Sequence, residues 1–309
     1  MSTSIAPTGE QWTIRSGDLE VVVVEVGGGL RSFTSAGRDV LWGFGQDEEC
    51  HGGRGQLLMP WPNRITDGQY ERDGQSQQLA LTEPARHNAI HGLVRWASWT
   101  LLEQADDRLT VGYRLHPQQG WSWTLELTVT YELDEQGLTV RPAARNIGTG
   151  DAPFGFGVHP YLTAGEQRVD ELEITLPAAS SMKVDPERLL PLGMQAVDGG
   201  LHDWREGRRV GDAQLDTAFT DLAADGDGRW RVRLHHPAGG RTTTLWADAA
   251  VYPWLQVFTG DALPEPLRRS SGVAVEPMTC PPDAFRSGQD LIVLAPGQEF
   301  EGLWGISAS

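Results

Sequence analysis

Two segments of the chain hold a titratable side chain directly before a proline. FGFGVHPYLT, at 154–163, contains His159, and SGVAVEPMTCPPDAF, at 271–285, contains Glu276. Proline disfavours the helical region for the residue before it, so both side chains are expected in extended backbone at strand ends. A histidine and a glutamate held in this way can give and take protons from opposite sides of a small molecule.

The neighbours of these two residues indicate what surrounds them. Gly155 and Gly157 remove side chains from one face of the histidine's strand, which leaves either a pocket or a tight bend of a curved sheet. Val273 and Val275 make the strand before Glu276 apolar. A buried carboxylate there is costly unless paired, and burial raises its pKa toward the range of a general base. An exposed strand end is the alternative for Glu276.

A third segment, MPWPNRITDG at 59–68, has two prolines that stiffen the loop leading to Asn63 and Arg64. The planar guanidinium of Arg64 suits paired acceptors such as adjacent sugar hydroxyls or a carboxylate. The alternative role of this arginine is to bridge main-chain carbonyls of the loop.

A fourth segment, RHNAIHGLVRW at 86–96, reads as a loop because His91 and Arg95 do not follow helical spacing. Gly92 allows a backbone or a ligand to approach His91 closely. A histidine that only hydrogen-bonds the loop is the alternative. Tyr161 and Trp254 stand near these segments or in the strand at 251–259, where they could stack on a sugar ring or simply pack in the core.

The elements that must position these residues are strands. Alternating apolar residues at 109–115, 124–133 and 230–234 predict strands with one buried face. The β-branched run at 21–24 predicts a strand buried on both faces. Asp73-Gly74 and Gly239-Gly240 are plausible hairpin turns, and no long window keeps helical periodicity. We therefore expect an all-β sandwich or barrel that forms a single domain over residues 1–309.

Composition excludes some partners. The chain of 309 residues carries a net charge of −17, which argues against nucleic acid and anionic membranes. No signal peptide and no membrane-spanning stretch is evident, so a cytoplasmic location is expected.

Cys50 and Cys280 are expected to be free thiols, although a pairing remains sterically open. No cluster of cysteine and histidine has the spacing of a metal site.

Five motifs together resemble the aldose 1-epimerase (mutarotase) family. They occur in the family's order between about residues 27 and 305. These are N-R-I at 63–65, Asn88 with His91-Gly92, G-V-H-P-Y at 157–161, L-D-T-A-F at 215–219 and A-V-E-P-M-T at 274–279. The resemblance implies a large antiparallel β-sandwich of the supersandwich, galactose mutarotase-like type.

The resemblance also implies roles. His159 is similar to the general acid that protonates the ring oxygen O5, and Glu276 to the base that removes the C1 hydroxyl proton. His91 is similar to a second histidine that assists at the ring oxygen. Arg64 and Asp216 resemble residues that hold the sugar hydroxyls. Asn63, Arg95, Tyr161 and Trp254 complete the expected substrate contacts. The resemblance implies a monosaccharide substrate and no metal or organic cofactor. We expect a monomer or a homodimer.

The sequence departs from the galactose-type pattern at two places. Trp61-Pro62 precedes Asn63, and His91-Gly92 continues into Leu93 rather than a second glycine. The H-G-x-x-R form resembles the hexose-6-phosphate branch, and in related bacterial branches a sulfosugar is conceivable. Arg54, Arg64 and Arg95 could then supply an anion site, or Arg95 could serve the fold alone. A mutarotase of an anionic hexose and a non-catalytic sugar-binding protein therefore stay open as alternatives.

Overall fold

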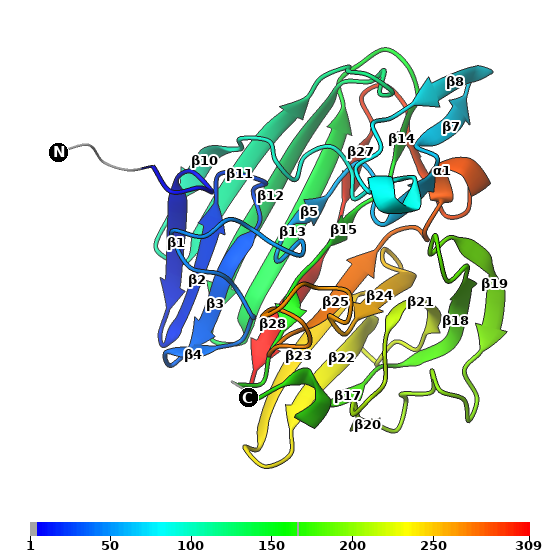
Figure 1. Cartoon of the computed structure of the whole chain (residues 1–309). Helices are drawn as coiled ribbons and strands as arrows, with labels where there is room; N and C mark the ends of the chain where they lie inside the picture. Colours follow the sequence, from blue (N-terminus) through cyan, green and yellow to red (C-terminus); the bar gives the residue numbers. More distant parts are fainter. Residues whose placement is uncertain (1–4, 166) are drawn as a thin grey trace.

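The computed structural model describes residues 5–165 and 167–309, and two large antiparallel sheets dominate it (Figure 1). The larger sheet has ten strands, with β27 pairing beside β28 on β13. In spatial order these are β10 (Thr100–Gln104), β11 (Arg108–Leu115), β12 (Leu125–Asp134), β13 (Gly137–Asn146), β28 (Trp304–Ala308), β23 (Arg241–Asp248), β22 (Arg229–His236), β17 (Glu173–Thr175) and β20 (Arg208–Arg209), with β27 (Glu299–Glu301).

The second sheet has eight strands and carries the residues of interest. Its order is β19 (Pro191–Ala196), β18 (Ala178–Val184), β21 (Asp216–Leu222), β24 (Trp254–Phe258), β25 (Val273–Met278), β15 (Gly157–Val158) and β5 (Leu57–Leu58), with β16 (Tyr161–Leu162) pairing β25.

Smaller elements complete the described chain. Four strands form an N-terminal sheet: β1 (Gln11–Ser16), β2 (Leu19–Val24), β3 (Leu30–Ser35) and β4 (Arg38–Asp39). Three two-stranded sheets are β6 (Arg64–Thr66) with β9 (Asn88–Ile90), β7 (Gln69–Arg72) with β8 (Gln75–Gln78), and β14 (Ala152–Phe154) with β26 (Ile292–Leu294). The helical segments are η1 (Pro84–Arg86), η2 (Val169–Glu171) and α1 (Ala284–Ser287). Within the described ranges no helix is long and apolar enough to cross a membrane.

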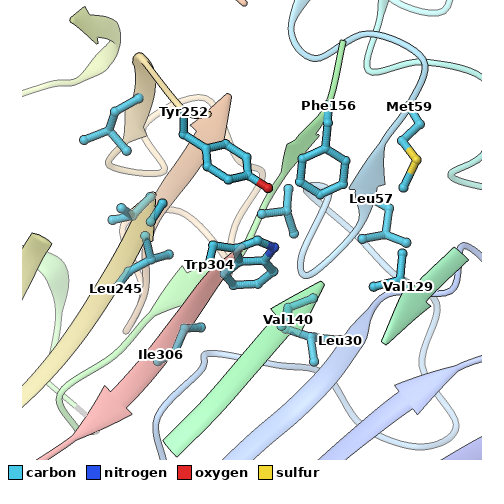
Figure 2. Close-up of a cluster of buried hydrophobic side chains, with 14 of the residues drawn as sticks. Leu30, Leu57, Met59, Val129, Val140, Phe156, Leu245, Tyr252, Trp304 and Ile306 are labelled. Atoms are coloured by element: carbon cyan, nitrogen blue, oxygen red, sulfur yellow. The ribbon is translucent and has the colours of Figure 1, made fainter. Parts of the chain in front are cut away.

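The strand predictions are confirmed. β12 alternates buried and half-buried residues along nearly its whole length, and 21–24 is buried throughout. Asp73 and Gly74 form the turn between β7 and β8. The inward side chains of the sheets meet in one apolar cluster, which Figure 2 shows around Phe156, Tyr252 and Trp304. The all-β class and the large antiparallel sheets are as the sequence predicts.

Strand alternation decides which side chains leave this core. In β25, Val273 and Val275 belong to the core cluster, so Glu276 points to the opposite face of the sheet. In β24, Leu255 and Val257 face the core in the same way, which sends Gln256 to the face of Glu276. The candidate site therefore lies on the outer face of the eight-stranded sheet.

Candidate active site

His159 and Glu276 are buried neighbours. His159 follows β15 and is 5% exposed, while Glu276 in β25 is 2% exposed. Their strands pair through Gly157 and Met278, and this brings the His159 Nε2 to 3.3 Å from the Glu276 Oε1. The sequence suggested two groups on opposite sides of a small molecule. Adjacent strands instead place them side by side, so both can act on neighbouring atoms of one ligand.

The glycines before His159 make room for a loop rather than for a pocket. A Cβ on Gly157 would stand 2.7 Å from the Cβ of Pro62. A Cβ on Gly155 would meet the sulfur of Cys280 at 2.6 Å. The space beside the strand is therefore filled by the stiff loop that carries Asn63, and the absence of side chains lets this loop lie against the strand of His159.

Burial disfavours charge on both members of the pair. Desolvation, with a smaller contribution from the positive charge of Arg95, lowers the pKa of His159 to about 3. Desolvation also raises the pKa of Glu276 well above its ordinary value, with the nearby Asp216 carboxylate adding to the rise. The surroundings therefore favour a neutral pair in which one proton lies on the carboxyl group.

His91 lies against His159 and is held by the loop at Asn63. The two histidine rings are edge to face with centroids 5.4 Å apart. The main-chain N–H of Asn63 donates to the His91 Nδ1 at 3.2 Å. The main-chain N–H of His91 donates to the Asn63 carbonyl at 2.9 Å. Both residues adopt left-handed backbone. Because Nδ1 accepts a hydrogen bond, a neutral His91 carries its proton on Nε2 and can donate it to a ligand.

Gly92 is required for this arrangement. Its φ is +73°, and a Cβ there would stand 1.9 Å from the carbonyl oxygen of Met59. Burial and the charge of Arg95 hold the pKa of His91 well below its ordinary value, so this imidazole is neutral near pH 7.

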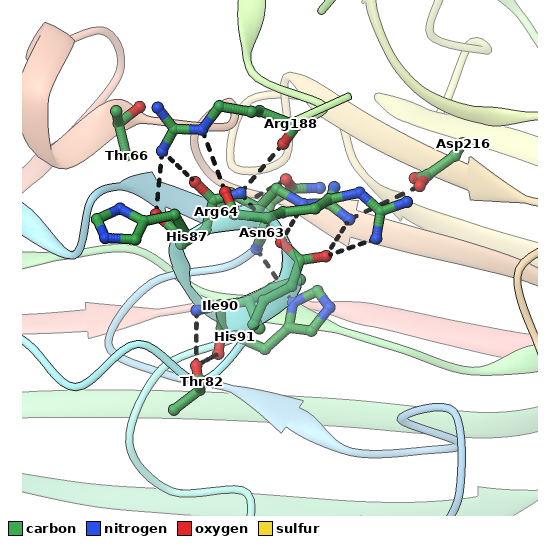
Figure 3. Close-up of polar contacts among 12 residues, drawn as sticks. Asn63, Arg64, Thr66, Thr82, His87, Ile90, His91, Arg188 and Asp216 are labelled. Carbon is green, nitrogen blue, oxygen red and sulfur yellow. Dashed lines mark hydrogen bonds and ion pairs between the residues drawn. The ribbon is translucent and has the colours of Figure 1, made fainter. Parts of the chain in front are cut away.

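Arg64 is fixed by a half-buried carboxylate, Glu83, that the sequence did not reveal. Its Nε and Nη2 donate to the two oxygens of Glu83 at 2.8 and 3.0 Å (Figure 3). Its Nη2 also lies 3.7 Å from the Asp216 Oδ2. The guanidinium pairs with two carboxylates and bridges no loop carbonyl in the described part of the chain. Such a bidentate pair fixes the plane and direction of the guanidinium.

These side chains surround a pocket of about 140 Å³. Asn63, Arg64, His91, His159, Asp216 and Glu276 all line it. Sequence reasoning missed the remaining lining residues. These are Glu83, Arg86, Gln256, Phe258 and Ala262.

The sequence contained a signal that could have identified Gln256 as a site residue. It stands between Leu255 and Val257 as a polar residue in an apolar strand, the same signal that singled out Glu276. Its Nε2 donates to the Asp216 Oδ1 at 2.6 Å, which orients that carboxylate toward the pocket. Its Oε1 and the Oε2 of Glu276 are buried without a hydrogen-bond partner among the described residues, so both can accept from a bound hydroxyl.

Three predicted substrate contacts lie outside the pocket lining. The Tyr161 ring stacks behind His159 with centroids 5.1 Å apart, and its hydroxyl donates to the Gly52 carbonyl. Trp254 is buried, and its Nε1 donates to Asp290 at 2.8 Å. Arg95 donates weakly to the Ile90 carbonyl and to Gln56, at 3.3 and 3.5 Å. The partners of these three residues are therefore protein groups.

Two further features concern metals and thiols. Donor atoms of His91, His159 and Glu276 lie within 4.8 Å of one another, a set that could also bind a divalent cation.

Cys50 and Cys280 are buried free thiols. Burial raises their pKa values to about 11 and about 12, which leaves both unreactive near pH 7.

Known proteins resemble this chain over most of its length. The family model described as aldose 1-epimerase matches residues 10–306. The uncharacterized protein YihR of Escherichia coli is 34% identical over 297 residues, covering 96% of this chain and 92% of that protein. The uncharacterized protein YphB of the same organism is 22% identical over 307 residues, which cover 93% of this chain and 94% of YphB.

Solved structures show the same fold. A GalM/aldose epimerase homologue from C. elegans superposes with a TM-score of 0.87 at 17% identity, covering 97% of this chain and 98% of that one. Galactose 1-epimerase from Lactobacillus acidophilus gives a TM-score of 0.80 at 21% identity, covering 97% and 94%. The fold is thus galactose mutarotase-like, and the protein belongs to the aldose 1-epimerase family.

Proposed function

We propose that this protein is an aldose 1-epimerase that interconverts the α and β anomers of a hexose. The observation that carries the proposal is the buried contact of 3.3 Å between His159 and Glu276 inside a polar pocket. The C1 hydroxyl oxygen and the ring oxygen O5 are bonded to the same carbon. An acid and a base that serve these two oxygens must therefore be neighbours.

The reaction moves two protons and breaks one bond. Glu276 takes the proton of the C1 hydroxyl, the C1–O1 double bond forms, and the C1–O5 bond breaks. O5 receives a proton from His159. Rotation about C1–C2 then presents the other face of the aldehyde, and the reverse transfers close the ring as the other anomer. Each positioned group contributes a factor of about 10² to 10⁴ to the rate.

Ring opening leaves the buried pair in its more favourable state. It starts with an ionised Glu276 beside a protonated His159 and ends with both groups neutral. Burial favours the neutral form of each group, so forming the reactive ion pair costs free energy, and ring opening returns this free energy when both groups become neutral again. Both forms hold one shared proton and differ only in its position.

The other lining residues hold the sugar. His91 donates from Nε2 toward the ring oxygen, because its Nδ1 is occupied by the Asn63 N–H. Arg64 donates to the hydroxyls, and Asp216 accepts from them. Since Glu83 and Gln256 already fix these two groups, little rotamer entropy is lost when the sugar binds.

A hexose with an anionic substituent is the second candidate, and Arg86 is the observation that favours it. Arg86 lines the pocket, and its contact with Glu83 is long, at 3.4 Å. Its Nε is buried without a partner among the described residues. Arg95, the residue that the sequence suggested, does not line the pocket. Arg54 donates to the carbonyls of His51 and Gly43, so its role is structural.

Polarimetry tests the proposal. Freshly dissolved α-glucose or α-galactose should reach its equilibrium rotation faster with the protein than without it. A panel that adds glucose 6-phosphate and a sulfonated hexose separates the two candidates. A preference for the anionic sugars that Arg86→Gln abolishes would favour the second. Calorimetry that detects sugar binding without any acceleration would instead identify a non-catalytic sugar-binding protein.

A further inference from the structure

Asn88 is a buried polar residue to which the proposed reaction assigns no role. It is 0% exposed, begins β9 shortly before His91, and lies outside the described lining of the catalytic pocket. A buried amide lowers stability unless its groups are hydrogen-bonded. The partners of this amide therefore indicate what it does in the fold.

The amide of Asn88 joins two segments that are distant in the sequence. Its Nδ2 donates to the Glu83 Oε2 and to the Arg188 carbonyl, both at 3.0 Å. Its Oδ1 accepts from the Arg188 Nη2 at 3.3 Å. Both amide N–H groups and the amide oxygen are thus occupied, so the side chain is held in one orientation.

Glu83 connects this amide to the pocket. Its Oε2 accepts from the Arg64 Nε at 2.8 Å as well as from Asn88. The main chains of Glu83 and Asn88 also exchange two hydrogen bonds, at 3.0 and 3.2 Å. Arg64 alone would let the carboxylate move together with the guanidinium. The second donor fixes the carboxylate relative to β9, so Arg64 is held against a fixed partner.

Asn88 also helps to keep Glu83 ionised. Burial acts to raise the pKa of Glu83, but the hydrogen bond and charge of Arg64, together with the hydrogen bond from Asn88, lower it below its ordinary value. The amide N–H can only donate, so it favours the charged carboxylate that the guanidinium of Arg64 requires.

Arg188 supports Asn88 from the loop between β18 and β19 (Figure 3). Its Nη2 donates to Asp67 at 2.7 Å and to the His87 carbonyl at 3.0 Å. Its Nε donates to the Arg86 carbonyl at 3.1 Å. These contacts hold the chain immediately before Asn88, so the amide has a rigid support on the side away from Glu83.

His91 is held in a different way, although it follows Asn88 closely in the chain. Its Nδ1 accepts from the main-chain N–H of Asn63 and not from the Asn88 amide. Loss of that amide should therefore disturb Arg64 and leave the acid–base pair in place.

We propose that Asn88, oriented by Arg188, is a positioning residue for sugar binding, which acts by holding Glu83 and through it Arg64. The inference rests on the proposed function of the pocket. Arg64 contacts the sugar hydroxyls before and during ring opening, so its misplacement weakens binding of the substrate and of the transition state alike. Such a loss raises KM and leaves kcat unchanged.

Mutarotation kinetics of the full-length protein with glucose test this role. We expect Asn88→Ala to raise KM about fivefold, the scale of one lost hydrogen bond, with kcat changed by less than threefold. Asn146→Ala is the matched control. Asn146 is also 0% exposed, and its Nδ2 donates to the carbonyls of Gly150 and Leu294, which lie outside the pocket lining. This control should lower Tm and change neither kinetic constant.

A double-mutant cycle with Glu83→Gln separates positioning from a general loosening of the fold. If Asn88 acts through Glu83, the double variant should have a KM within about twofold of that of Glu83→Gln alone. Independent effects would multiply, to roughly fiftyfold over wild type. Arg188→Gln, which alters a side chain that is 35% exposed, replaces Asn88→Ala in the cycle if that variant does not fold. It should raise KM threefold or more, again without adding to Glu83→Gln.

The outcomes separate this inference from the proposed function. If wild type accelerates mutarotation but Asn88→Ala leaves KM within twofold, lowers kcat instead, or multiplies with Glu83→Gln, the positioning role is wrong and the epimerase assignment stands. If wild type accelerates no sugar, the epimerase assignment fails and the role of Asn88 fails with it.

Discussion

The Nε2 of His159 and the Oε1 of Glu276 lie 3.3 Å apart in a site where each side chain is less than one-tenth exposed. At this distance and burial the two groups share a single proton more readily than either holds a charge alone. The pair therefore behaves as one titrating unit. Its proton can lie on the carboxyl group or on the imidazole, and the proposed ring opening moves it from one to the other.

Removing either member should abolish most of the activity. Glu276→Gln cannot accept the C1 hydroxyl proton, and His159→Asn cannot supply one to O5. We expect kcat for glucose or galactose mutarotation to fall by about 10² or more in each variant. The double variant should be little worse than either single one, because the two groups act as a unit.

Conservative changes elsewhere provide the controls. His235→Asn alters a half-buried histidine on β22, outside the pocket, and should leave kcat within twofold of wild type. Full activity of both Glu276→Gln and His159→Asn would show that the assigned acid–base chemistry is wrong.

The activity should persist at a pH where ordinary histidines become charged. The active pair holds one proton, and it gains a second only below the depressed pKa of His159, about 3. It loses its last proton only above the raised pKa of Glu276. We therefore expect kcat/KM to stay level from about pH 7 down to about pH 5, through the ordinary histidine pKa of about 6.5.

Arg95 provides a check on the cause of this plateau. Its charge lowers the pKa of His159 although it does not line the pocket. Arg95→Gln should move the acid limb of the profile to higher pH and leave the KM for glucose unchanged. An acid limb near pH 6.5 in the wild type would contradict the buried, one-proton pair.

Much of this arrangement was accessible from the sequence because strand geometry is periodic. The alternation at 124–133 predicted β12, and the valines around Ala274 predicted an apolar strand that leads to Glu276. Glu276 was expected at the strand end, but β25 continues to Met278. Pro160 and Pro277 marked the two titratable residues. Such signals are local, and they give the direction of a side chain relative to its own strand.

The parts that the sequence did not reveal depend on contacts between distant segments. Glu83 carries no local sign that it will meet Arg64, since the two meet only when β6 and β9 pair. Tyr161 and Trp254 were expected against the substrate because of nearness in the chain. Tyr161 instead stacks on His159, and Trp254 packs with Ala218 and Met278, so neither lines the pocket.

The Glu83 contact should matter for binding more than for chemistry. Glu83→Gln keeps the size of the side chain but removes the charge that holds Arg64 in its bidentate geometry. We expect KM to rise about tenfold, the scale of losing a charge-assisted hydrogen bond, with kcat changed by less than threefold. Glu71→Gln, on the exposed face of β7, is the matched control and should change neither constant. A fall in kcat at constant KM would contradict a positioning role.

The buried carboxylate should also make the protein less stable at higher pH. The pKa of Glu276 is raised in the folded state, so the folded protein holds this proton more tightly than the unfolded chain does. Stability from this group is therefore full below the ordinary glutamate pKa and falls as pH rises toward the raised value. Glu276→Gln removes this dependence, so its Tm should exceed that of wild type by more at pH 8 than at pH 5. The expected difference at pH 8 is on the order of 2 °C or more. Glu103→Gln, an exposed residue of β10, controls for loss of charge alone, and an equal Tm gain in both variants would refute a cost specific to the site.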